Sequence, residues 1–355
     1  MKLAVAALVV CALATPGEAE IRRTIAGSLQ LDYLAVPTEQ APRQFTLDGA
    51  TLELSLKMSV DFSEHASATV KACFACHGFE AASAFIGLRA ADELAVKAGR
   101  LIPAFGSFPQ RHDPANHHTS DKPLPYDMGR MLHRTEWNEG VLPSPWVDNG
   151  IEVGGTHFFE DGRVDYAAYV LSGPKSESPM ATDFDFVLSR TPYYTDNNSQ
   201  PVAGARLAGA LDIDDATTFE LGASGMAGHY DTEGKLAFWI AGVDVAAKLA
   251  ALTLRAEYLV RRTETSDSGA FLKHGYFGEG ELALGRVELI ARFDGLYRKG
   301  AATPALADRA TLERATLAAA VRVVADVRVK TSVEYYWFSD FDDELAVHLG
   351  VATPF

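Results

Sequence analysis

"LELSLKMSV", residues 52–60, alternates apolar and polar side chains without interruption. A β-strand places successive side chains on opposite faces, so this stretch has one apolar face and one polar face. The same rhythm recurs in "LTLRAEYLVR" (252–261), "RVELIARFDG" (286–295) and "VRVKTSVEYYW" (327–337). Strands of about ten residues can cross a bilayer when they are tilted. Because an open sheet edge cannot persist in lipid, the pattern predicts a closed transmembrane β-barrel around a watery lumen.

This strand pattern continues along the whole chain and predicts an all-β, antiparallel barrel of about sixteen strands. The predicted strands lie near 26–35, 52–62, 67–74, 82–91, 95–104, 149–159, 164–173, 201–213, 219–230, 236–249, 251–264, 271–285, 286–298, 312–325, 327–340 and 344–355. An even number suits a bacterial barrel. Short turns such as "SEHA" and "EDGR" alternate with longer connections such as "RKGAATPALADRA", and we expect the longer ones to face outward.

Composition narrows the class of protein. The chain has 355 residues, and 47 acidic against 32 basic residues give a net charge of −15, which argues against a nucleic-acid partner. No internal segment approaches the roughly 20 apolar residues that a membrane helix needs. The sequence lacks GxSxG, P-loop and GxGxxG motifs, so we expect no enzymatic activity. No linker interrupts 20–355, which we expect to form a single domain.

Both ends of the chain indicate export to the bacterial outer membrane. Residues 1–19 contain a lysine, an apolar run and small residues before the expected cleavage after Ala19, as in a signal peptide. Cys11 would be removed with that peptide. The last stretch, "ELAVHLGVATPF", alternates strictly and ends on Phe355, which is similar to the terminal strand of outer-membrane barrels.

Four segments, "LAVKAGRLIPAFGS", "DNGIEVGGTHFF", "VDYAAYVLSGP" and "PVAGARLAGALDI", resemble parts of the sixteen-stranded, phosphate-selective type of porin. The resemblance implies a long third outer loop, here 105–148, folded into the lumen, diffusion of small hydrophilic solutes or ions, and a homotrimer. Phosphate selectivity does not follow from it, because that family uses a lysine ladder, whereas basic and acidic residues are mixed here. The residues expected to line the pore are Arg111, Lys122, Arg130, Arg134, Arg255, Arg261, Arg292 and Arg328.

The motif "ACFACHG" (72–78) has three interpretations that the sequence leaves open. Cys73, Cys76 and His77 form the CxxCH pattern to which a c-type haem is attached, with His77 as a ligand of the iron. The two cysteines could instead form a disulfide in a structural barrel, or be a chance match or a metal-binding pair. A haem would make the barrel an electron-transfer protein with a periplasmic redox partner. Against haem, the motif follows a predicted strand, whereas haem motifs usually begin a helix.

The predicted third loop holds further histidines that bear on this question. His112, His117 and His118 are candidates for the sixth iron ligand. The alternative is a solvated constriction whose arginines and lysines set ion preference by their field. A divalent metal held by histidine and aspartate is a third interpretation, although no HExxH-like pattern supports it.

Overall fold

The computed structural model describes residues 21–37, 49–75, 78–127, 140–176, 183, 189, 196–267, 269–300, 309–324, 326–340 and 342–355. The predicted signal peptide, residues 1–19, lies outside this part of the chain. No helix among the described residues is long and apolar enough to cross a membrane.

Sixteen β-strands form where the alternating pattern predicts them. They are β1 (Arg22–Ala35), β2 (Gly49–Asp61), β3 (Ala66–Ala75), β4 (Gly78–Ala91), β5 (Leu94–Leu101), β6 (Asp148–Phe159), β7 (Gly162–Leu171), β8 (Val202–Asp214), β9 (Thr217–His229), β10 (Ala237–Leu249), β11 (Leu252–Glu264), β12 (Ala270–Leu284), β13 (Val287–Lys299), β14 (Arg309–Val324), β15 (Val327–Phe338) and β16 (Glu344–Pro354). Each overlaps one predicted strand, so the prediction of an all-β chain is confirmed.

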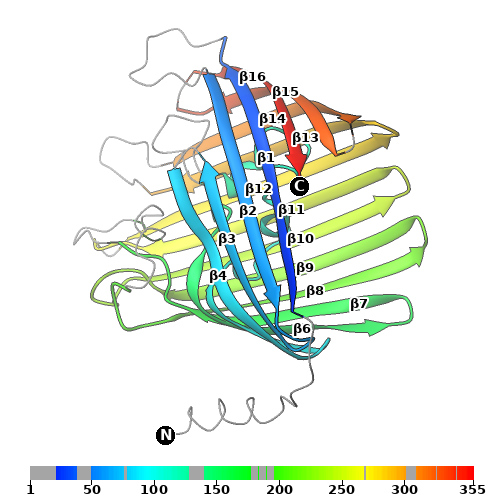
Figure 1. Ribbon diagram of the computed structural model, residues 1–355. Coiled ribbons are helices and arrows are strands. Elements are labelled where there is room, and N and C mark those ends of the chain that lie inside the picture. The colour runs from blue at the N-terminus through cyan, green and yellow to red at the C-terminus, as the bar shows by residue number, and fades with distance from the viewer. Residues whose placement is uncertain are drawn as a thin grey trace, which may run out of the picture.

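The sheet closes on itself as an antiparallel barrel in which every strand pairs with its neighbours in sequence (Figure 1). β1 completes the ring by pairing with β16, with Ser28 opposite Pro354 and Ala35 opposite Val347. Phe355 and Gly27 exchange two backbone hydrogen bonds, of 2.8 and 3.0 Å, just beyond this ladder. Closure leaves no edge unpaired among the strands that the structure describes, which is the condition for a sheet to exist in lipid.

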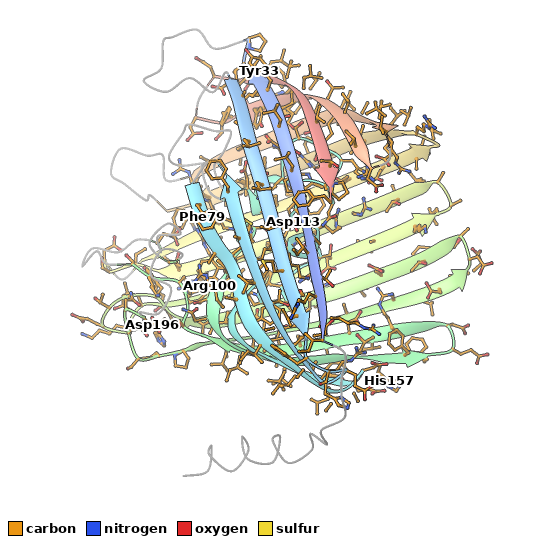
Figure 2. The ribbon with its side chains drawn as sticks, in the orientation of Figure 1. Tyr33, Phe79, Arg100, Asp113, His157 and Asp196 are labelled. Atoms are coloured by element: carbon orange, nitrogen blue, oxygen red, sulfur yellow. The ribbon has the colours of Figure 1, made fainter. Side chains whose placement is uncertain are left out.

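Because neighbouring strands run in opposite directions, successive connections alternate between the two ends of the barrel. The connections at one end are short, and most of those at the other end are longer. One end carries the short turns 62–65, 92–93, 160–161, 215–216, 250–251, 285–286 and 325–326. The other end carries 36–48, 76–77, 102–147, 172–201, 230–236, 265–269, 300–308 and 339–343. Tyr33 and His157 mark these two ends in Figure 2: Tyr33 lies near the end with the long connections and His157 beside a short turn.

The outer surface of the barrel is apolar. Leu221, Leu317 and Leu349 each expose 60% or more of their surface, and large apolar side chains are exposed on strands all around the ring. Aromatic side chains gather at the two rims. Exposed aromatics near the end with the long connections are Tyr33, Phe74, Phe79, Trp239, Tyr335 and Trp337, and those near the short turns are Phe62, Phe158, Phe159, Phe219 and Phe355. An apolar band between two aromatic girdles is typical of transmembrane barrels.

Candidate functional site

The connection between β5 and β6, residues 102–147, enters the barrel, and we call it the inward loop. Among its described residues it forms two short 3-10 helices, η1 (Phe108–Arg111) and η2 (Leu124–Tyr126). η2 packs on β12 and β13. The apolar side chains of the loop are buried in one cluster with strand residues such as Phe277 and Leu296. The loop therefore occupies part of the lumen and leaves a narrower passage.

Glu257, on β11, fixes the first turn of the inward loop. Its carboxylate accepts hydrogen bonds from the backbone N–H groups of Ser107 (3.2 Å) and Phe108 (2.8 Å). It also accepts from the hydroxyls of Ser107 (2.6 Å) and Tyr126 (2.5 Å). Burial and the nearby Glu257 raise the pKa of Tyr126 well above its usual value, so this hydroxyl remains a donor. Gly106 has a φ of 63°, and a Cβ there would lie 2.0 Å from the Tyr126 hydroxyl, so the turn requires glycine.

Basic side chains on β11 and β13–β15 bind the backbone of the same loop. Arg328 donates to the carbonyl oxygen of Ala115 (3.3 Å), and Lys330 donates to those of Pro114 (2.5 Å) and His117 (2.7 Å). Arg292 donates to the carbonyl oxygen of Asp121 (3.1 Å) and Arg314 to that of Lys122 (2.7 Å). Arg261 donates to the carbonyl oxygen of Val141 (2.9 Å). Hydrogen bonds from charged donors contribute about 1.5–3 kcal/mol each. The inward loop is thus held to the wall along most of its described length.

Arg314, on β14, lies at the centre of a buried ionic network behind the loop. Its guanidinium donates to Asp294 at 2.6 Å and contacts Glu334 and the Tyr336 hydroxyl at 3.2 Å each. Asp294 in turn accepts a hydrogen bond from the backbone N–H of Leu124 at 3.0 Å. A buried charge is stable only when it is paired in this way. The network therefore fixes η2 against the wall.

His112 and Lys71 join the inward loop to β3. The His112 ring accepts from the Lys71 ammonium at Nε2 (2.9 Å), while its Nδ1 lies 2.5 Å from the Pro109 carbonyl oxygen. Burial and the adjacent Lys71 charge lower the pKa of His112 to about 4, so the ring is neutral near pH 7. Lys71 also forms an ion pair with Asp113 at 2.6 Å. Burial and the nearby Lys330 likewise lower the pKa of His117 well below its usual value.

The three proposed sixth ligands lie in different places. His112 is next to β3, the strand that carries Cys73. The backbone of His117 contacts β15 through Lys330, and the His118 ring lies 3.0 Å from Glu281 on β12. Only His112 is therefore bound to the strand that carries the first cysteine of the motif.

Cys73 itself lies on β3, half-buried, opposite Ser55 of β2 and Glu80 of β4. It belongs to the strand face of Lys71, two residues earlier, and this face points into the lumen. Cys76 and His77 fall between β3 and β4 and lie outside the described residues. The motif thus begins on a strand, as predicted.

A cavity of about 1070 Å³ lies in the part of the lumen that the inward loop does not fill. It is bounded by the first turn of the loop and by β4–β11, and it reaches toward the short turns. Its charged lining residues are Arg89, Lys97, Arg111, Arg163, Arg206, Lys248 and Arg255 together with Asp92, Glu152, Asp165, Asp212, Glu220 and Asp244. Seven basic and six acidic groups leave this cavity nearly neutral, although the chain carries −15.

The residues predicted to line the pore divide into three groups. Arg111 and Arg255 line the cavity. Arg261, Arg292, Lys122 and Arg328 contact backbone oxygens of the inward loop, and the first two side chains are only 1% exposed, so they hold the loop instead of facing the passage. Arg130 and Arg134 lie outside the described residues.

Several residues that shape the site were not singled out by sequence reasoning. Arg206 pairs with Asp244 at 2.6 Å in the cavity wall, and Arg314 forms the buried network. Both occupy lumen-facing positions of strands whose other face is apolar. The alternation of apolar and polar residues could therefore have predicted that both side chains face inward. It could not have predicted their partners, which lie on other strands or on the loop.

Comparisons with known proteins identify the fold. No family model and no curated protein matches the sequence. Among solved structures, the outer membrane channel DcaP of Acinetobacter baumannii aligns with a TM-score of 0.60 at 10% identity, covering 96% of this chain and 99% of that one. The anion-selective porin from Comamonas acidovorans aligns with 0.58 at 11% identity (95% and 100% covered), and OmpT of Vibrio cholerae with 0.56 at 8% (97% and 99%). At these identities the likeness establishes the closed sixteen-stranded barrel of outer-membrane porins.

Proposed function

We propose that this protein is a porin of the bacterial outer membrane that lets small hydrophilic solutes or ions diffuse across the barrel. The observation that carries the proposal is a charged cavity of about 1070 Å³ inside a closed barrel whose outer face is apolar. Thirteen charged groups line that cavity, and such groups are stable where water can solvate them. Two of the similar structures are described as a porin and a channel. Diffusion needs no catalytic step, and the proposal includes none.

Selectivity should be weak and set by charge at the narrow part of the passage. Arg206 pairs with Asp244, and Arg255 pairs with Glu279 and Glu281, so much of the field of these cations is cancelled. Arg111, on the inward loop, approaches its carboxylate partner Glu279 only to 4.0 Å. Because it is the lining cation that the inward loop carries, we expect it to favour anions. Selectivity for phosphate is not part of the proposal.

Liposome swelling tests the function. Purified protein folded into vesicles should admit small sugars and ions at rates that fall steeply with solute size. Protein-free vesicles and vesicles mixed with unfolded protein are the controls. Folded protein that inserts into vesicles and leaves them as tight as the protein-free ones would refute the proposal.

Reversal potentials test the role of Arg111. Arg111→Gln should move ion preference toward cations, because it removes a positive charge from the cavity lining. Lys235→Gln is the matched control, since Lys235 is exposed outside that cavity and pairs with Glu233. An equal shift in both variants would mean that Arg111 does not set the preference.

We also propose that the protein assembles as a homotrimer, since OmpT of Vibrio cholerae has a trimer form. Covalent haem at Cys73, Cys76 and His77, with electron transfer to a periplasmic partner, stays a separate prediction that the comparisons do not support. A peroxidase-active band after denaturing electrophoresis, lost in Cys76→Ser, would support it. A colourless protein whose thiols react only after reduction would support the structural disulfide instead.

A further inference from the structure

Asp121, Glu334 and His348 converge where the inward loop meets the wall. Asp121 belongs to the loop, Glu334 to β15 and His348 to β16. Their nearest ligand atoms lie within 4.8 Å of one another, and all three residues are buried. His348 Nε2 lies 3.7 Å from Asp121 Oδ2 and 4.0 Å from Glu334 Oε2. Three segments that are far apart in sequence thus bring one imidazole nitrogen and two carboxylates to a single point.

Asp32, on β1, orients the imidazole. Its Oδ2 lies 2.8 Å from His348 Nδ1, which directs Nε2 toward Asp121 and Glu334. A carboxylate behind the outer nitrogen of a histidine is the usual support of a metal-ligating imidazole, because it fixes the tautomer and raises ligand basicity. His348 is 0% exposed, so the ring has no solvent to bind.

Glu334 and His348 each have one buried atom with no hydrogen-bond partner among the described residues. These atoms are His348 Nε2 and Glu334 Oε1. The other oxygen of Glu334 is satisfied, by the Tyr336 hydroxyl at 2.7 Å and by Arg314 at 3.2 Å. A polar atom buried without a partner costs about 1–3 kcal/mol. A cation bound between Asp121, Glu334 and His348 would give His348 Nε2 a partner.

The charges of the surroundings favour a cation. His348 lies between the carboxylates of Asp32, Asp121 and Glu334. Arg314 contacts Asp121 at 3.6 Å and Glu334 at 3.2 Å, but it is shared with a fourth carboxylate, Asp294. Carboxylates this close together repel unless positive charge lies between them. A mixed set of imidazole and carboxylate ligands suits zinc and related transition metals better than calcium or magnesium, which prefer oxygen alone.

We propose that Asp121, Glu334 and His348 bind one Zn²⁺ ion. Zinc bonds of about 2.0–2.2 Å hold ligand atoms roughly 3.3–3.6 Å apart in a tetrahedron. The separations of 3.7 and 4.0 Å from His348 Nε2 lie slightly above this range, and all three ligand atoms lie within 4.8 Å of one another, so the side chains would draw together on binding. Water would complete the fourth position. The metal would join the inward loop to the β15–β16 hairpin. The proposed zinc site does not depend on the proposed porin function.

Calorimetric titration with ZnCl₂ tests the site in the full-length barrel, folded in detergent and treated with a chelator beforehand. Wild-type protein should bind one zinc per chain. Loss of a supporting residue typically weakens a metal site 10–100-fold, so Asp121→Asn and Glu334→Gln, which remove ligands, should weaken it about 100-fold or more. Retention of the compact, unheated band on a denaturing gel shows that each variant is folded, and Asp121→Asn changes no strand residue.

Glu288→Gln is the matched control. Glu288 is another buried lumen glutamate beside a histidine, with His118 Nδ1 3.5 Å away. This variant should bind zinc as the wild type does. The proposal is overturned if zinc binding follows Glu288 instead, if it is weak and unaffected by Asp121→Asn and Glu334→Gln, or if no zinc binds. The last result would leave a protonated His348 as the positive charge between the carboxylates.

Discussion

Among the described residues, Glu257 is the side chain that makes the most hydrogen bonds to the inward loop, and it is 4% exposed. Two backbone N–H groups and two hydroxyls donate to it. Glu257→Ala would leave these donors without an acceptor. We expect the free energy of unfolding to fall by about 2–4 kcal/mol, as measured by urea titration in lipid vesicles.

A comparison with Glu220→Ala separates this effect from general loss of charge. Glu220 also lines the cavity, but its side chain is 44% exposed and its partner is Arg163, not the loop. That substitution should change the free energy of unfolding by less than about 1 kcal/mol. Similar losses in both variants would contradict the anchoring role of Glu257.

His112 makes the attachment of the loop depend on pH. Its pKa is about 4 in the folded protein and about 6.5 in an unfolded chain, so the unfolded state binds more protons between these values. The free energy of unfolding should therefore be highest above about pH 6.5 and decline as pH falls toward 4. His112→Gln should make that decline shallower. An equally steep decline in the variant would mean that other titrating groups cause the pH dependence.

At the scale of strands, the two faces of each ribbon have different roles. Leu317 projects from the middle of β14 and is 68% exposed on the outer surface, whereas Ile213 is exposed near the end of β8. An arginine at the bilayer midplane costs about 2–4 kcal/mol and near the interface about 0–1 kcal/mol. Leu317→Arg should therefore destabilise the folded barrel in vesicles far more than Ile213→Arg. Equal effects would argue against a lipid-facing surface.

The strands could be predicted from sequence because a period of two is local information. "LELSLKMSV" needs no knowledge of the rest of the chain to be assigned as β2, and the short turns follow from the gaps between such stretches. The path of the inward loop is different. It depends on contacts such as Ser107 to Glu257, which are 150 residues apart and leave no periodic signal. For the same reason the sequence marked Arg261 and Arg292 as pore-lining, although both are bound to the loop.

At the scale of the whole molecule, the proposed porin function assigns to ring closure and the inward loop together the control of what can pass. The barrel alone would enclose a wide channel, since sixteen strands leave an aqueous lumen. The loop is held to β11 by Glu257 and to β14 and β15 by Arg314 and Lys330. The cavity beside β4–β11 lies in the space that the loop leaves. Loosening the loop should widen that passage without opening the ring.

Single-channel conductance in planar lipid bilayers tests this account most directly. The wild-type protein should give discrete, ohmic current steps, and Glu257→Ala should give larger or noisier steps because the loop no longer narrows the passage as tightly. Protein that inserts into the bilayer in folded form and carries no current, in either version, would contradict the account.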